Sequence, residues 1–179
     1  MNDVTGAIRQ KARELLEGKQ VDCVIGYEAG PKGRARPAFI YDPAEADRLI
    51  FDATCVHNLV NYLHDKKKPR KRGEQPPRVA VVAKPCDSRA VNVLLAERQI
   101  ERERVTVIGV ACEGMENAGG KQQARCVRCS DRTPVVYDVL LGESPSLPLS
   151  PSPHPPNEYD DLNQIEALPY SDRLAFWLR

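Results

Sequence analysis

Four of the six cysteines stand at positions from which their thiols could meet. Cys86 ends the strand-like run of residues 78–86, and Cys112 ends the similar run of residues 105–112. Cys126 and Cys129 form the pair Cys-Val-Arg-Cys in a loop rich in Gly, Gln and Arg. Two strand ends and one adjacent loop can bring four thiolates to one place, where they would hold zinc or an iron–sulfur cluster.

The same cysteines could instead form disulfides or be buried thiols. The first residues, Met1-Asn-Asp-Val-Thr, lack the basic and apolar regions of a secretory signal, so we expect a cytoplasmic protein. In a reducing compartment, cysteines serve metal or redox chemistry more often than disulfides. Structural zinc sites usually pair their ligands as two Cys-x-x-Cys knuckles, and this chain has one such pair. The pattern therefore favours an iron–sulfur site, with zinc and buried thiols as alternatives.

The segment around Cys86 and Cys112 predicts a β–α–β unit. Residues 78–84 and 105–111 are continuous apolar runs, as expected for strands buried on both faces. Between them, a helix capped by Asp87 or Ser88 and running to Gln99 would carry the crossover, which makes the strands parallel. Both cysteines would then lie at the carboxyl ends of parallel strands, the edge where open α/β sheets place ligands. We expect an α/β fold: a small, mostly parallel sheet with flanking helices and the cysteine cluster at this edge.

Hydrophobic periodicity predicts the remaining elements. They are a helix over residues 4–17, strands at 23–27 and 39–41, a helical stretch at 42–49 capped by Asp42, a helix at 55–64 capped by Thr54, and a strand or short helix at 134–142. Cys23 lies inside a strand and is interpreted as a packing residue. Cys55 would lie in the first turn of a helix, where the dipole favours a thiolate, or be a small buried side chain.

The C-terminal part of the chain differs in composition. Residues 143–156 contain six prolines, at 145, 148, 151, 153, 155 and 156, and predict an extended linker. Residues 171–179 predict a short amphipathic helix. We therefore expect an α/β iron–sulfur domain over residues 1–142, followed by a Pro-rich tail over 143–179 made of a linker and a docking segment.

Composition and missing motifs exclude several functions. The net charge of +1 gives no global field for nucleic acid, and no run of eighteen apolar residues predicts a membrane span. The basic run at residues 66–72 contains no aromatic residue and is interpreted as a solvated loop. There is no serine–histidine–acid pattern, no P-loop and no G-x-G-x-x-G, and His57 and His64 are read as ordinary helix residues.

Several segments together resemble one known family, the beta subunits of coenzyme F420-reducing hydrogenase and formate dehydrogenase. The resemblance is strongest to bacterial and archaeal relatives found beside heterodisulfide-reductase-like proteins, and it covers roughly residues 5–142. The segments that carry it are Ala83-Lys-Pro-Cys-Asp-Ser-Arg-Ala, Ile108-Gly-Val-Ala-Cys-Glu-Gly-Met, Cys126-Val-Arg-Cys, residues 134–142, and the N-terminal stretches at 22–28, 37–40 and 54–63.

The resemblance implies a 4Fe–4S cluster with the ligands Cys86, Cys112, Cys126 and Cys129. Cys55 lies in a segment that recurs in the family and is a possible fifth ligand. Founding members also bind FAD and reduce the deazaflavin coenzyme, but no flavin-binding segment can be matched residue by residue here. Longer relatives continue past a segment like residues 173–179 into ferredoxin cysteine motifs, and this sequence ends at Arg179. A ferredoxin-like or heterodisulfide-reductase-like partner subunit is therefore implied.

The function expected from the sequence is electron transfer. The chain would be an accessory, non-catalytic iron–sulfur subunit of a multi-subunit oxidoreductase complex of the hydrogenase, formate dehydrogenase or heterodisulfide-reductase-like kind. One alternative is a zinc-stapled structural or adaptor subunit. The other is a flavin-dependent subunit that acts on a deazaflavin or a nicotinamide.

Overall fold

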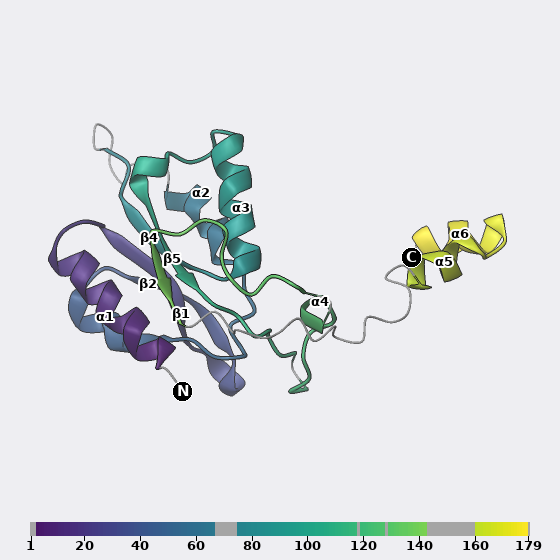
Figure 1. The fold of residues 1–179 in the computed structure, drawn as a ribbon, viewed down its shortest axis with the longest axis horizontal. Helices are drawn as coiled ribbons and strands as arrows, with labels where there is room; N and C mark the ends of the chain where they lie inside the picture. Colours follow the sequence, from purple (N-terminus) through teal and green to yellow (C-terminus); the bar gives the residue numbers. More distant parts are fainter. Residues whose placement is uncertain (1–2, 67–74, 118, 128, 143–159, 179) are drawn as a thin grey trace. The chain divides into compact units, whose positions relative to one another are not determined.

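A computed structural model describes residues 3–66, 75–117, 119–127, 129–142 and 160–178 (Figure 1). The chain divides into two compact units, Met1–Ser146 and Leu147–Arg179, and each is described by itself. The Pro-rich segment at 143–156, with the predicted domain boundary at its start, lies outside the described residues. So does the basic run at 66–72 beyond its first residue.

The first unit is built around a six-stranded sheet whose central strands are parallel. The strand order is β2-β1-β4-β5-β6, and β3 also pairs with β1. Strands β1, β4, β5 and β6 run parallel, whereas β2 and β3 are antiparallel to β1. This confirms the predicted α/β class and the mostly parallel sheet. The strands are β1 (Cys23–Ala29), β2 (Ala35–Ile40), β3 (Leu49–Ile50), β4 (Val79–Ala83), β5 (Val105–Val110) and β6 (Val139–Leu141).

The two longest helices cover opposite faces of the sheet, α1 (Val4–Glu17) on one side and α3 (Pro85–Ala96) on the other (Figure 1). Asp3 caps α1 by accepting a hydrogen bond from the backbone N–H of Gly6 at 2.9 Å. The apolar face predicted from the periodicity is the buried one, because Ile8, Ala12, Leu15 and Leu16 are all in the core. Each face of the sheet is thus packed against one long helix (Figure 1).

The predicted β–α–β unit is present as β4, α3 and β5, with Val79 paired to Val105 and Ala83 to Gly109 in a parallel ladder. All five residues of β4 are buried, as the apolar run predicted. The predicted start of the helix was wrong. Helix α3 begins at Pro85, a residue suited to the first helical position, and Lys84 is its N-cap. It ends at Ala96 rather than Gln99, and Cys86 consequently lies within its first turn.

The predicted helix at residues 55–64 was also wrong in its first half. The backbone is a 3₁₀ helix, η3 (Leu59–Tyr62), followed by the short helix α2 (Leu63–Lys66). Asn58, rather than Thr54, supplies the cap, by accepting from the N–H of Val60 at 3.0 Å. The Thr54 hydroxyl instead accepts from the N–H of Ala35 at 3.0 Å. A long-range contact therefore holds Thr54, and residues 54–58 stay outside the helix.

The remaining elements are short. Asp42 caps η2 as predicted, its side chain accepting from the N–H of Ala44 at 2.9 Å. The apolar run at 134–142 provides a strand, β6, which pairs with β5. The other elements of the first unit are η1 (Pro31–Gly33), η2 (Pro43–Arg48), η4 (Arg102–Arg104) and α4 (Ala124–Val127).

The second unit, as far as it is described, consists of α5 (Asp160–Glu166) and α6 (Tyr170–Trp177). Its large apolar side chains are exposed, and Trp177 retains 66% of its accessible surface. Phe176 and Trp177 stack edge to face with ring centroids 5.2 Å apart. Across the residues that the structure describes, no helix has both the length and the apolar character needed to cross a membrane.

Candidate metal centre

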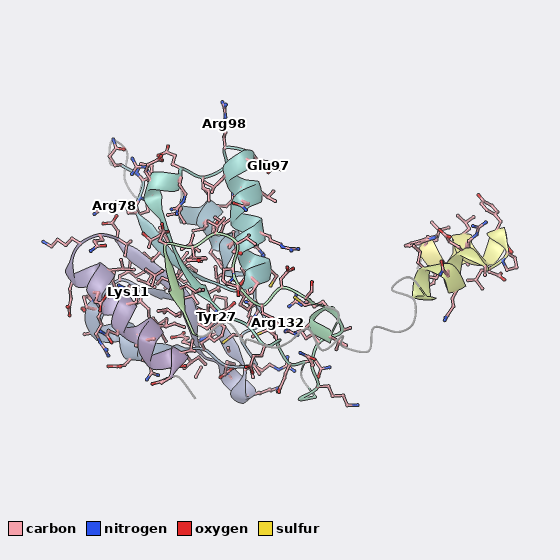
Figure 2. All side chains as sticks on the ribbon, viewed as in Figure 1. Lys11, Tyr27, Arg78, Glu97, Arg98 and Arg132 are labelled. Carbon is pink, nitrogen blue, oxygen red and sulfur yellow. The ribbon has the colours of Figure 1, made fainter. Side chains whose placement is uncertain are left out.

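A cavity of about 110 Å³ opens at the carboxyl edge of the parallel strands, and four cysteines line it. They are Cys86, Cys112, Cys126 and Cys129, the four that the sequence singled out. The other residues of its wall are Lys84, Pro85, Gly114, Met115, Arg125, Asp131 and Arg132. In Figure 2, Arg132 lies at this end of the sheet beside α4, whereas Glu97 and Arg98 lie at the opposite end, where α3 stops.

The four thiols come from three different parts of the fold. Cys86 is in the first turn of α3, which follows β4, and Cys112 stands two residues after the end of β5. Cys126 is in α4, and Cys129 follows that helix. The N–H of Cys112 donates to the carbonyl of Arg132 at 3.0 Å, and this bond holds the segment after Cys129 against the end of β5. The Cys-x-x-Cys pair is thereby brought to the strand ends.

The cysteines differ in exposure. Cys112 is buried, Cys126 and Cys129 are half-buried, and Cys86 is exposed. Partial desolvation raises the pKa of the Cys86 thiol to about 11, and the nearby Asp87 carboxylate adds to this rise. Burial likewise raises the pKa of Cys112, against a hydrogen bond of 3.4 Å that its sulfur accepts from the N–H of Gly114. Without a metal the Cys86 and Cys112 thiols are therefore protonated at neutral pH, and a metal that binds them must displace their protons.

The donor set and the space fit a cluster of several atoms. All four thiols are free rather than disulfide-bonded, so their sulfurs are available as ligands. Among the described residues, no three His, Cys, Asp or Glu side chains are grouped closely enough to hold a metal ion. One water needs about 10–15 Å³ in a cavity, and 110 Å³ therefore admits a much larger group. Soft thiolates are the ligands of iron–sulfur clusters.

The other two cysteines lie elsewhere. Cys23 is fully buried in β1, in agreement with a packing role. Cys55 is also fully buried and does not line the cavity. Its sulfur accepts from the N–H of Asp52 at 3.4 Å, and burial raises its pKa to about 12. The structure thus separates Cys55, the possible fifth ligand, from the four cysteines of the cavity wall.

Sequence reasoning missed a buried polar group in the cavity wall. The Lys84 side chain is 2% exposed, and its ammonium pairs with the carboxylate of Asp87 at 2.8 Å. It also donates to the carbonyl of His57 at 2.8 Å and to the hydroxyl of Tyr27. Burial raises the pKa of Tyr27 well above its ordinary value. One sequence signal was present: Lys84 directly follows a fully apolar strand and stands three residues before an acid on the same helix turn.

Two arginines border the same cavity. Arg125 donates to the carbonyl of Val56 at 3.0 Å, and this bond ties α4 to the segment before η3. Arg132 lies in the wall, while Asp131 pairs with Arg89 of α3 at 2.6 Å. The basic groups of the wall suit a negatively charged occupant, as a cluster with four thiolate ligands would be.

Two known proteins are similar to this chain. No protein-family model matches the chain. The F420-dependent formate dehydrogenase subunit beta of Methanocaldococcus jannaschii is 30% identical over 115 residues, which are 61% of this chain and 27% of that protein. A chain of the F420-reducing [NiFe] hydrogenase complex from Methanosarcina barkeri superimposes with a TM-score of 0.51 at 17% identity, covering 63% of this chain and 39% of that one.

These matches confirm the resemblance to the beta subunits of F420-reducing hydrogenase and formate dehydrogenase. The sequence match points to a formate dehydrogenase subunit, and the structural match shows that the fold also occurs in the hydrogenase complex. The chain spans only about a quarter of the length of the formate dehydrogenase subunit. One relative is a subunit of a formate dehydrogenase, and the other belongs to a hydrogenase complex.

Proposed function

We propose that this chain is an iron–sulfur electron-transfer subunit of a multi-subunit oxidoreductase complex. The observation that carries the proposal is the single cavity lined by Cys86, Cys112, Cys126 and Cys129 at the carboxyl edge of the sheet. A 4Fe–4S cluster, when bound, would accept and release one electron at a time. The protein's part is to supply four thiolates, to limit access of water and to present the site to a neighbouring subunit.

The two strand-end cysteines have different tasks in this proposal. Cys112 is buried and has a hydrogen bond to its sulfur, so it would hold the inner side of the cluster. Cys86 is exposed and would face outward, toward the subunit that exchanges electrons with the chain. The orphan N–H groups of the first turn of α3 favour negative charge at Cys86, whatever the oxidation state.

Anaerobic purification tests the proposal directly. We expect a brown protein with about four iron and four sulfide per chain, as a 4Fe–4S cluster requires. A colourless protein with one zinc per chain would contradict it and support the zinc-stapled alternative. Yellow flavin released on denaturation would instead support the flavin-dependent alternative, which also has no matched binding segment in the sequence.

We further propose that a ferredoxin-type iron–sulfur subunit docks on helix α6. This proposal rests on the family resemblance, in which such motifs follow a segment like residues 173–179, and on the exposure of Leu174, Phe176 and Trp177. Helices this short are marginal on their own in water, so we expect another surface to cover their exposed apolar side chains.

Trp177→Ala should reduce recovery of the co-expressed partner without changing the iron content. Val93→Ala, at an exposed apolar position of α3, serves as the control. Equal recovery with Trp177→Ala and wild type would refute this docking role.

A further inference from the structure

A buried ion pair forms part of the wall of the cysteine cavity. The side chains of Lys84 and Asp87 are 2% and 3% exposed, and their charged atoms are 2.8 Å apart. Lysine and aspartate are almost never fully buried unless they are paired. Replacing such a pair with apolar residues is often neutral or stabilising, so stability alone does not explain it. We therefore looked to the cavity, which Lys84 lines, for the role of the pair.

The ammonium of Lys84 is held in a fixed position. It has three N–H donors, and three acceptors surround it: the Asp87 carboxylate, the His57 carbonyl and the Tyr27 hydroxyl. It also lies 4.8 Å from the centre of the Tyr27 ring, within the range of a cation–π contact. Tyr27 in turn donates to the same His57 carbonyl. The positive charge is thereby fixed by β1, by the loop before η3 and by α3 together.

The two members of the pair differ in their position relative to the cavity. Lys84 lines the cavity and Asp87 does not, but the Asp87 carboxylate accepts from the Cys86 thiol at 3.7 Å and from the backbone N–H of Lys84 at 3.3 Å. A bound group would therefore feel both charges, the cation of Lys84 and the carboxylate beside Cys86. Because the pair is out of water, its field is weakly screened and reaches farther than that of a surface pair.

We propose that Lys84, oriented by Asp87, raises the reduction potential of the centre held by the four cysteines. The inference rests on the proposed iron–sulfur function. Reduction adds one negative charge to the site, and a fixed positive charge in the wall stabilises the reduced form relative to the oxidised one. Net charge near a cluster is one of the factors that determine its potential. Lys84 is a positioning and tuning residue here and does not itself react.

The test is the midpoint potential of the loaded, full-length protein, measured by a redox titration followed by electron paramagnetic resonance. Lys84→Met should shift the potential in the negative direction, because the stabilising cation is lost. Asp87→Asn should shift it in the positive direction, because the cation is no longer offset by a carboxylate. The double variant should lie between the two single variants. If the pair had only a structural role, the two single substitutions would not shift the midpoint potential in opposite directions.

A matched ion pair on the outer side of the fold provides the control. Lys11 and Glu14 of α1 have the same i, i+3 spacing and an ion-pair distance of 2.6 Å, but their side chains are 28% and 46% exposed, so water reaches both. Lys11→Met and Glu14→Gln should leave the potential unchanged because water screens their charges. Shifts as large as those at Lys84 and Asp87 would overturn the inference.

The outcomes distinguish this inference from the function on which it rests. A wild-type protein without iron and sulfide overturns both. If the wild type binds iron and sulfide but the potentials of the Lys84 and Asp87 variants shift in the same direction, or not at all, only the tuning role is overturned. If Lys84→Met does not fold, Lys84→Gln takes its place in the same titration: a potential that is unchanged or more positive than that of the wild type contradicts the proposal, and a more negative one supports it.

Discussion

The two edges of the parallel sheet each carry a cavity, and only one of them has the chemistry of a binding site. At the amino edge, a cavity of about 170 Å³ is larger than the cysteine cavity of about 110 Å³. Among the described residues, its wall contains no cysteine or histidine and combines apolar residues with polar ones: Leu63, Pro76, Pro77, Val79, Ile100 and Val105, with Arg98, Gln99, Glu101 and Arg104. Arg104, which also lines it, already pairs with Glu101 at 2.7 Å and donates to the carbonyl of Pro76. Volume therefore does not identify the site, whereas the set of available donors does.

The difference follows from how parallel strands end. At the carboxyl edge each strand is followed by a loop or a helix N-terminus. The free N–H groups there stabilise negative charge by donating hydrogen bonds to it. Cys86 and Cys112 occupy such positions after β4 and β5. At the amino edge the chain enters the strands, and here Pro76 and Pro77 precede β4 without offering an N–H at all. The four predictions below test this contrast.

The largest effect is expected from the cysteines of the carboxyl edge. Replacing any one of Cys86, Cys112, Cys126 or Cys129 with Ala should abolish or nearly abolish the bound iron and sulfide, because a cluster needs all four ligands. Cys23→Ala, at a buried cysteine outside the cavity, should retain them. Metal and sulfide analysis after anaerobic purification measures both. Full iron content in two or more of the four variants would show that the cavity is not the site.

The second effect concerns alkaline pH and Cys55, a fully buried cysteine that does not line the cavity. Burial raises the pKa of this thiol to about 12 in the folded protein, above its ordinary value of 9. The folded state keeps a proton that the unfolded state releases, so stability is unaffected below about pH 9 and falls as pH rises toward 12. The loss should reach about 1.4 kcal/mol per pH unit within this window.

Unfolding measured against pH for wild type and Cys55→Ala isolates this contribution. The variant should have a shallower alkaline slope, because its buried group no longer ionises. Tyr27, whose pKa is raised in the same direction, keeps some slope in both proteins. Parallel curves for the two proteins would rule out a role of Cys55 in alkaline unfolding.

A smaller effect is expected at the amino edge. Val105→Ile adds one methylene group to the wall of the larger cavity, at a residue that is 7% exposed. We expect the free energy of unfolding to rise by up to about 0.8 kcal/mol, the value of one buried methylene. Iron content should not change. Denaturant unfolding and iron analysis of the same sample check both parts. A loss of iron would show that the two edges are coupled.

The smallest effect is expected from removing the C-terminal part. Its prolines cannot donate to a sheet ladder or continue a helix, so deletion of residues 143–179 should leave the iron content and the unfolding midpoint of the α/β domain unchanged. The comparison is between full-length and truncated protein purified side by side. Insoluble truncated protein would mean that the tail contributes to the core.

The sequence by itself determined the central unit of this protein. The apolar runs before Cys86 and Cys112, with a helical pattern between them, can be satisfied only by two buried parallel strands and a crossover. That local pattern already predicts which edge carries the thiols. The periodicity of α1 likewise determined which of its faces is buried, because the spacing of Ile8, Ala12, Leu15 and Leu16 is a local property.

The tertiary structure decided what depends on partners distant in sequence. Lys84 and Tyr27 are 57 residues apart, and their contact exists only because β1 is the neighbour of β4 in the sheet. The bond from Ala35 to Thr54 holds Thr54 outside a helix, against the local preference at residues 55–64. Cys55 is not among the residues that line the cavity. The Cys-x-x-Cys pair reaches the strand ends through the contact of Arg132 with Cys112. Local spacing carries no information about such contacts, because their energy comes from neighbours that only the folded chain provides.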